Sequence, residues 1–511
     1  MKKRSVDCDL FSELQQNGIL NEKERLELFN IGCTPLPLCV RINQKSKYRD
    51  LLKTLFNNSC DEIKVIQNHE IFIWNNNKSV KKEIKEIIDN AVERNYCYRQ
   101  ELCSMFPPLV IESLINKYHI NTVLDICAAP GSKTSQLVEN NIFVTANDID
   151  PKRVQILAHR LNCWGNINIL NCSIDQIKGK YDCILCDAPC SGDGTLRKSS
   201  NPWFKWKLTT SFENHRIQLK IIRESLKRLN ENGIIIYSTC SMNPIEDEAV
   251  VHSILKEFQG NIQLIDIHHI IPNGRNGVSV WKKYDTINCP VTCYPPIEDY
   301  NLERCVRILP QDYNSGGFFI AALRINRSIS TASSDKDTME CFEKVNKDNT
   351  LWSQFKNEFE LQPIENNILM KKDNSLYSWY NGNPIYQSVF CGCKLFERRR
   401  KDDYSLSSFR LCEDGLFMIH SLIKKRRVKL SLEYFLKLQY EPIPFSSFSM
   451  EIQNELMKWK EGSIIIEITQ KNCILDSFYF IGWIGKTTLN HNVSKEEWKL
   501  IRLLLNEFHI Q

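Results

Sequence analysis

The stretch LDICAAPGSKT, from Leu124 to Thr134, decides the fold. It begins as a short apolar run, continues through small residues and leads into a helical pattern, as the first turn of a doubly wound α/β sheet does. Its last four residues resemble a phosphate-binding loop, but Cys127 and Ser132 stand where that motif needs glycine. We therefore expect a ligand at the carboxyl end of this strand, and not a nucleotide triphosphatase.

The same alternation of apolar runs and helical patterns extends from Thr122 to Asn326. The expected strands are TVLDIC, IFVTAND, NINILN, YDCILCDAP, GIIIYSTC and GGFFIAALRIN. Asp150 can cap a helix that Pro151 opens and Gly165 ends. A second helix, IQLKIIRESLKRLNENG, is expected to end at Gly233, directly before the fifth strand. Strands that alternate with helices predict βαβ units and a parallel sheet.

The bulk composition is that of a soluble globular protein with two or three domains. The chain has 511 residues, of which 42% are hydrophobic and 25% charged, and a net charge of +5 that neither requires nor excludes a nucleic-acid partner. We find no apolar run long enough to span a membrane and no signal-peptide pattern, so we expect an intracellular protein. Its 21 cysteines are then thiols and not a disulfide framework.

Changes of pattern along the chain predict three domains. Residues 1–97 mix helical and strand patterns, as a small α+β module does, and residues 98–326 form the α/β domain. Residues 327–349 are polar and predict a linker. Residues 350–511 form a further α+β unit.

The loop after the first strand has the features of a cofactor site. Ala128, Ala129 and Gly131 let a ligand approach the backbone closely, and the helix start that follows favours a carboxylate or a phosphate. Asp148, at the end of the second strand, can accept hydrogen bonds from both hydroxyls of a ribose. These features predict a nucleoside cofactor with an anionic tail. S-adenosylmethionine and a dinucleotide both fit.

Two cysteines follow the fourth and fifth strands. Asp187 and Cys190 end the fourth strand and Cys240 ends the fifth, so neighbouring strands would bring both thiols to the cofactor crevice. Thiols beside a methyl donor indicate cytosine-5 chemistry, in which a thiolate adds to C6 and activates C5. Nearby cations such as Lys133, Arg197 and Lys198 favour a thiolate. Asp187 can hold the exocyclic amine or N3 of a cytosine.

Other polar groups of this region have simpler interpretations. Cys183 and Cys186 point to opposite faces of a strand, which favours packing over chelation. Cys190 and Cys240 have no His or Cys at ligand spacing, so we expect no metal. For Glu246, Asp247 and Glu248 a structural role is favoured over a catalytic one, because Asn243 can cap a helix that Pro244 opens, and carboxylates stabilise its first turn.

Three motifs resemble those of a known family. LDICAAPGSKT, CDAPCSGDGT and YSTCSMNPIEDEAVV (Tyr237 to Val251) are similar to the cofactor, Pro-Cys and Thr-Cys motifs of the RsmB/NOP (Sun-domain) RNA cytosine-5 methyltransferases. RQELCSMFPPL and LERCVRILPQDYNSGGFFIAAL resemble the eukaryotic multisite tRNA branch. The resemblance implies a Rossmann-like, S-adenosylmethionine-dependent methyltransferase core with a mostly parallel seven-stranded sheet, and tRNA as the substrate. The alternatives are ribosomal RNA as the substrate and a noncatalytic RNA-binding protein.

The resemblance also implies roles for residues. Cys240, in the Thr-Cys motif, is the expected nucleophile and Cys190 assists product release, whereas spacing alone does not choose between them. Lys133 and Asp187 are expected close to the target base. The expected cofactor contacts are Cys127, Ala128, Ala129, Pro130, Gly131, Ser132, Lys133, Asp148 and Asp187. One departure is Ser173, which stands where the family has an acidic residue near the adenine, with Asp175 two positions later.

Cationic segments are candidates for RNA contacts. Arg197, Lys198, Trp203 and Trp206 alternate charge with aromatic rings, although a packed tryptophan pair explains them equally well. ERRRKDD (Glu397 to Asp403) and KKRRVK (Lys424 to Lys429) predict a phosphate-facing patch, within a C-terminal domain that by resemblance is PUA-like and binds RNA. KKRRVK also fits a nuclear address. We expect a nuclear or nucleolar protein, with the cytoplasm as the alternative.

Overall fold

The computed structural model describes most of the chain. The described residues are 5–67, 69–75, 80–329, 342–345, 350–362, 367–371, 375–379, 388–398, 409–470, 474–475 and 477–508. Most of the expected linker at 327–349, and residues 399–403 of the ERRRKDD stretch, lie outside them. Among the described residues, none of the helices has the length and hydrophobicity to cross a membrane.

A ten-stranded mixed sheet forms the centre of the molecule. Its strand order is β11-β12-β13-β9-β8-β5-β6-β7-β17, and β10 also pairs with β13. The strands are β5 (Thr122–Asp125), β6 (Phe143–Asn147), β7 (Ile167–Leu170), β8 (Tyr181–Asp187), β9 (Leu229–Thr239), β10 (Ile262–Ile265), β11 (Arg275–Asn276), β12 (Val306–Ile308), β13 (Phe318–Ile325) and β17 (Phe390–Cys391). Strands β7, β6, β5, β8 and β9 are parallel, and β13 runs antiparallel to β9. The Rossmann-like α/β fold is confirmed.

The sheet is wider than the expected seven strands. Two short strands, β11 and β12, lengthen one edge. At the other edge β17, which comes from the C-terminal part of the chain, pairs antiparallel with β7 through Phe390 and Ile169. The extra strands cover edges that would otherwise expose unpaired backbone groups.

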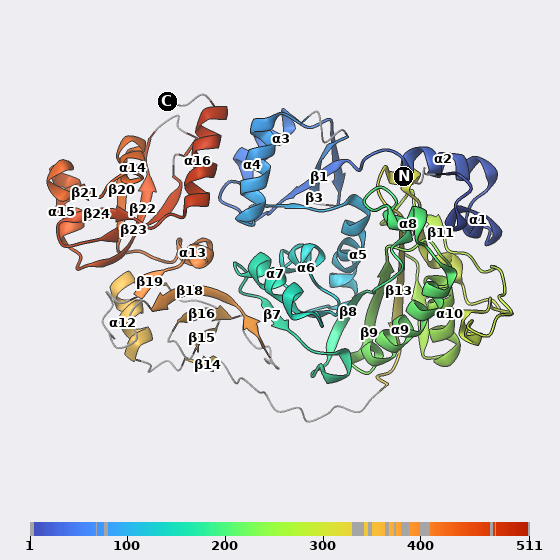
Figure 1. The fold of residues 1–511 in the computed structure, drawn as a ribbon. Coiled ribbons are helices and arrows are strands. Elements are labelled where there is room, and N and C mark those ends of the chain that lie inside the picture. Colours follow the sequence, from blue (N-terminus) through green and yellow to red (C-terminus); the bar gives the residue numbers. More distant parts are fainter. Residues whose placement is uncertain are drawn as a thin grey trace.

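Helices cover both faces of this sheet (Figure 1). They are α5 (Leu102–Tyr118), α6 (Ser132–Val138), α7 (Pro151–Leu161), α8 (Asn201–Phe204), α9 (Leu208–Leu226), α10 (Glu248–Glu257) and α11 (Pro310–Tyr313). Side chains alternate between two cores, so that Cys183 packs with the α5 and α7 side and Cys186 with the α9 and α10 side. The prediction that these two cysteines occupy opposite faces is therefore confirmed.

Three predicted helix boundaries differ from the structure. Helix α7 is capped by Asp150 as predicted, but it ends at Leu161 and not at Gly165. Helix α9 ends at Leu226, and β9 already begins at Leu229. The segment before Gly233 joins the strand because the Asn230 side chain donates a hydrogen bond to Asp182 of β8 (2.7 Å). The helix expected after Asn243 begins only at Glu248.

The N-terminal part has two pieces. Helices α1 (Asp9–Gln16) and α2 (Glu22–Gly32) pack on the central domain, where Leu10 and Phe11 share a cluster with Trp203 and Met242. The second piece is an antiparallel sheet in the order β2-β3-β1-β4 with two helices. Its elements are β1 (Leu38–Ile42), α3 (Arg49–Asn57), β2 (Glu62–Ile66), β3 (His69–Trp74), α4 (Lys82–Glu93) and β4 (Cys97–Arg99).

The C-terminal part contains two five-stranded sheets, β14-β15-β16-β18-β19 and β20-β22-β23-β24-β21. The first comprises β14 (Phe342–Lys344), α12 (Thr350–Phe359), β15 (Asn367–Lys371), β16 (Leu376–Trp379), β18 (Cys393–Arg398) and β19 (Phe409–Leu411), followed by α13 (Glu413–Ile419). The second comprises β20 (Arg427–Leu430), α14 (Leu432–Leu438), β21 (Ile443–Pro444), α15 (Met450–Met457), β22 (Gly462–Ile468), β23 (Tyr479–Ile484), β24 (Thr488–His491) and α16 (Lys495–Glu507). Figure 1 shows the N-terminal sheet between α16 and the central domain.

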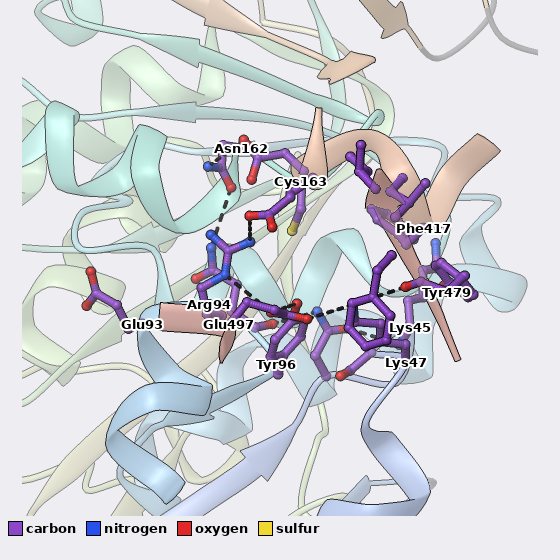
Figure 2. Close-up of a pocket in the computed structure, with 18 of the residues that line it drawn as sticks. Lys45, Lys47, Glu93, Arg94, Tyr96, Asn162, Cys163, Phe417, Tyr479 and Glu497 are labelled. Atoms are coloured by element: carbon purple, nitrogen blue, oxygen red, sulfur yellow. Dashed lines mark hydrogen bonds and ion pairs between the residues drawn. The ribbon is translucent and has the colours of Figure 1, made fainter. Parts of the chain in front are cut away.

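A buried carboxylate joins the N-terminal and C-terminal parts. Glu497 of α16 accepts a hydrogen bond from the Tyr96 hydroxyl (2.5 Å) and pairs with Lys47 (2.6 Å) and Arg94 (3.6 Å), all from the N-terminal part (Figure 2). It also accepts from the Tyr48 hydroxyl (2.8 Å). Residues of α4 and α16 also share one hydrophobic core. The two parts therefore form one continuous packed unit.

We expect Glu497→Gln to lower the free energy of unfolding by about 3 kcal/mol at pH 7, because it removes the charge from a buried ion pair. Burial opposes the charge on Glu497, but Lys47 and Arg94 outweigh burial and lower its pKa. A lowered pKa stabilises the folded state above the ordinary pKa of 4.5, and this stabilisation disappears as the pH falls through the folded value. Denaturant unfolding of both proteins at pH 7 and at low pH measures the difference, which should shrink in acid.

Candidate active site

The two predicted thiols lie together at the carboxyl ends of two neighbouring strands. Cys190 follows β8 and Cys240 follows β9, and these strands are parallel neighbours. Their Sγ atoms are 3.2 Å apart, well beyond the ~2.05 Å of a disulfide bond, and both cysteines are free and partly exposed. Among the described residues, no group of His, Cys, Asp and Glu is arranged to hold a metal ion. The two sulfur atoms are therefore placed to act on one ligand.

Lys133 and Asp187 form an ion pair beside the thiols. The Lys133 ammonium, from α6, donates to Asp187 Oδ2 at 2.7 Å, and Asp187 Oδ1 accepts from the Ser238 hydroxyl at 2.8 Å. Burial disfavours the charge on Lys133, but the Asp187 carboxylate outweighs burial and raises the pKa of the lysine. Lys133 is therefore a fixed cation, and it interacts electrostatically with Cys240.

A second cation, Lys198, also lies near Cys240. Lys198 forms an ion pair with Glu101, which precedes α5. Burial again opposes the charge, and Glu101 raises the pKa of Lys198 above its ordinary value; Lys198 also interacts electrostatically with Cys240. Glu101 was not among the predicted site residues. Its one signal in the sequence was its place in the RQELCSMFPPL motif.

A cavity of about 250 Å³ lies under these ion pairs. It is lined by Asp125, the loop residues Cys127, Ala128, Ala129, Pro130, Ser132 and Lys133, and Asp187, together with Arg99, Gln100, Glu101, Ser104 and Lys198. Gly131 has a φ of +98°, and a Cβ there would lie 2.9 Å from Leu157 Cδ1. Glycine is therefore required at this turn, which brings the loop backbone to the cavity.

Two carboxylates of the first strands support the cavity differently. Asp148 is buried, accepts from the Ala129 amide at 3.3 Å and pairs with Arg153 at 3.1 Å, so it holds the loop and does not line the cavity. Asp125 lines the cavity, and its Oδ2 accepts from the Thr134 hydroxyl at 2.7 Å. Burial raises the pKa of Asp125 to about 7. Its Oδ1 is buried with no hydrogen-bond partner among the described residues.

Comparisons with known proteins relate this domain to a family. A family model described as 16S rRNA methyltransferase RsmB/F matches residues 113–324. This part of the chain is therefore similar to the RsmB/F methyltransferases. It is 29% identical over 506 residues to the multisite-specific tRNA:(cytosine-C(5))-methyltransferase of Saccharomyces cerevisiae, covering 80% of this chain and 72% of that protein. It is 28% identical to the tRNA (cytosine(34)-C(5))-methyltransferase of Drosophila melanogaster, covering 80% and 69%.

A solved structure is also similar to part of this chain. The crystal structure of a methyltransferase homolog from Pyrococcus horikoshii has 23% identity and a TM-score of 0.46, covering 62% of this chain and 94% of that one.

Ser173 and Asp175, the residues considered for a contact with an adenine, lie outside the lining of the cavity. Ser173 follows β7, and its hydroxyl donates to Asp175 at 2.8 Å across a short 3-10 helix, Ile174–Gln176. Neither residue lines the cavity. A contact of either with an adenine remains a prediction.

The aromatic and cationic segment after Cys190 is mostly packed. Trp203 is buried against Phe11 and Phe29, and its indole donates to the Leu196 carbonyl at 2.9 Å. Trp206 packs on the same cluster. Arg197 donates to the carbonyls of Thr34 and Pro35. Packing therefore explains the tryptophans, whereas Lys198 lines the cavity.

Only part of the KKRRVK segment is exposed: Lys424, Lys425 and Lys429 lie on the surface, and the predicted phosphate-facing patch remains a prediction. Arg426 is 1% exposed and binds Glu358 and the carbonyls of Lys460 and Ser463. Arg427 pairs with Glu467 at 3.2 Å. The pattern of charges in the sequence did not show that the segment enters a strand, β20, whose first residues are anchored by these contacts.

The three acids after Cys240 make structural contacts, but only Glu248 lies in the helix that follows. Helix α10 begins at Glu248, because Asn243 Oδ1 accepts from the nearby Ile245 amide at 3.0 Å and forms a turn instead of a cap. All three carboxylates are fully buried. Glu248 pairs with Arg307, and Asp247 accepts from the Thr239 hydroxyl at 2.7 Å.

Proposed function

We propose that the chain is an S-adenosylmethionine-dependent tRNA cytosine-5 methyltransferase that acts through a covalent bond between Cys240 and C6 of the cytosine. The observation that carries the proposal is the pair of sulfur atoms 3.2 Å apart, with the Lys133–Asp187 and Lys198–Glu101 ion pairs near them. The names of the yeast and fly relatives, both tRNA cytosine-C5 methyltransferases, support tRNA as the substrate.

The cavity fits the methyl donor by the chemistry of its lining. Asp125 Oδ1 is a buried acceptor without a donor among the described residues, as the amino group of a ligand requires, and the small side chains of Ala128 and Ala129 leave the loop backbone accessible. The residues that would hold the donor are those of the loop from Cys127 to Lys133, with Asp125 and Asp187. Asp148 does not line the cavity, so its contact with the donor remains a prediction. When bound, S-adenosylmethionine supplies an electrophilic methyl group and leaves as S-adenosylhomocysteine.

Asp187 and Lys133 are placed to hold the target base. A carboxylate accepts the hydrogen bond of the cytosine amine, and the ammonium of Lys133 stabilises negative charge that spreads onto N3 and O2 of the ring. The Cys240 thiolate adds to C6 and forms a C–S bond, so the electrons of the C5–C6 double bond become available at C5. Lys133 and Lys198 both interact electrostatically with Cys240, so their positive charge lies near the sulfur that adds to the base.

Release restores the aromatic ring. After C5 takes the methyl group, its proton passes to water and the electron pair re-forms the C5–C6 double bond. The C6–S bond breaks, and the electrons of that bond return to Cys240 as a thiolate. The thiol of Cys190, 3.2 Å away, is placed to donate a hydrogen bond to the departing sulfur.

Mapping of 5-methylcytosine at single-nucleotide resolution tests the proposal. We expect purified protein and S-adenosylmethionine to methylate defined cytosines in tRNA and to leave ribosomal RNA unmodified. Bisulfite sequencing of both RNAs after incubation measures this. Methylation of ribosomal RNA alone would overturn tRNA as the substrate. Absence of methyl transfer, together with calorimetry that shows no binding of S-adenosylmethionine, would favour a noncatalytic RNA-binding protein.

A further inference from the structure

Two buried carboxylates connect the loops of the two thiols by crossed contacts. Asp193 follows Cys190 in the chain, but its carboxylate accepts from the Met242 amide at 2.5 Å and the Ser241 hydroxyl at 3.1 Å. Both donors lie directly after Cys240. The loop of the first thiol therefore holds the loop of the second.

Glu246 makes the reciprocal contact. It follows Cys240, but its Oε2 accepts from the Ser191 amide, next to Cys190, at 2.8 Å. Asn214 and Gln218 of α9 donate to the same oxygen at 3.0 and 3.3 Å. The loop of the second thiol therefore holds the loop of the first, and α9 anchors this contact.

The backbones of the two loops also touch. The Gly194 amide donates to the Cys240 carbonyl at 2.9 Å. A Cβ at Gly194 would lie 2.7 Å from that carbonyl oxygen and 2.4 Å from the Gly317 oxygen, so only glycine fits between them. With this close approach, the crossed hydrogen bonds fix the relative position of the two sulfur atoms.

We propose that Asp193 and Glu246 are positioning residues, which hold Cys190 against Cys240 so that it assists release of the methylated RNA. The proposal rests on the proposed function, because release has meaning only if Cys240 forms a bond to the base.

Carboxylates lie near Cys190, whereas lysines lie near Cys240. Asp193 and Glu246 therefore affect the charge state of Cys190 as well as its position. Contact with the Cys240 sulfur and burial raise the pKa of Cys190, and Glu246 and Asp193 raise it further. Burial also raises the pKa of Asp193 to about 7, and the nearby Glu246 adds to this. Asp247 lies beyond them beside Arg307. Cys190 therefore stays a thiol, which can donate a hydrogen bond, whereas the lysines face Cys240.

The positions of the thiols can be measured without RNA. Dibromobimane bridges two thiols that lie close together, and peptide mass spectrometry gives the share of labelled Cys240 that is bridged to Cys190. We expect this share to fall about tenfold in Asp193→Ala and Glu246→Ala, because each loses a buried charged hydrogen bond. Glu497→Gln removes a buried carboxylate far from the thiols and should keep the wild-type share. An unchanged share in both alanine variants would overturn the proposal.

The amide variants Asp193→Asn and Glu246→Gln keep most of the hydrogen bonds and so test the charge in a folded protein. We expect them to keep the bridged share. Product release in a single turnover should slow at alkaline pH, where Cys190 loses its proton. Loss of a nearby negative charge lowers the pKa of Cys190, so this decline should move to lower pH in the amide variants. A purely structural role would leave this decline in place. If the decline does not move in either amide variant, the inferred effect of charge on Cys190 is wrong.

The covalent complex with RNA separates this proposal from the proposed function. In the two alanine variants we expect the ratio of Cys240–RNA adduct to free product to rise about tenfold. A general folding defect would lower adduct and product together, and that result would count against positioning. If the wild-type protein forms neither product nor adduct with tRNA, the proposed function fails, and the bridged share alone decides whether the carboxylates position the thiols.

Discussion

Cys240→Ala is expected to abolish methyl transfer, with a rate roughly 10⁴- to 10⁶-fold below that of the wild-type protein. C5 of a cytosine is too weak a nucleophile to take a methyl group until a thiolate has added to C6. Cys103 and Cys127 also lie near the Lys133 and Lys198 ion pairs, but burial raises the pKa of both thiols. Cys190 faces the carboxylates Glu246 and Asp193, which disfavour its thiolate, so we do not expect it to replace Cys240.

Transfer of a labelled methyl group from S-adenosylmethionine to tRNA measures this loss. Cys183→Ala is the matched control, because it removes a thiol that is fully buried in the core of the same domain. We expect the control to retain methyl transfer with somewhat lower stability. A normal rate in Cys240→Ala would show that the nucleophile is another residue.

The positions of the central strands along the chain were predictable because each strand is a buried apolar run with a clear end. Helix α7 was equally clear, since Asp150 caps it by accepting from the Lys152 amide at 2.8 Å, a local contact. Strand β17 was not predictable. It is only Phe390–Cys391, too short for a periodic pattern, and it pairs with β7, more than 200 positions earlier in the chain.

The residues of the candidate site also include some that the sequence predicts and some that it does not. Cys190, Cys240 and Asp187 were predictable because each stands at the end of a parallel strand, where open sheets bind ligands. The crossed contacts of Asp193 and Glu246 join two loops about 50 positions apart, so they depend on tertiary packing and leave no local pattern. The same reason explains Arg426, whose partner Glu358 lies 68 positions away.

Cys190→Ala has a different expected result from Cys240→Ala, namely a covalent complex that persists. Attack by Cys240 and methyl transfer do not need Cys190, so the first turnover should proceed as far as the methylated adduct. Release then lacks the thiol that lies 3.2 Å from the departing sulfur. We expect turnover to fall at least about a hundredfold, as for the loss of a positioned proton-donating group.

The adduct is visible as an RNA–protein complex that survives denaturing electrophoresis. The double variant Cys190→Ala with Cys240→Ala should lose it, because no sulfur remains to bond C6. If Cys190→Ala instead turns over normally and no complex accumulates, Cys190 has no part in release, and the crossed carboxylates would then serve only to hold the loop of Cys240. A complex that persists in the double variant would mean that RNA is held by another residue. The two single variants and the double variant therefore assign the nucleophile and the release group independently.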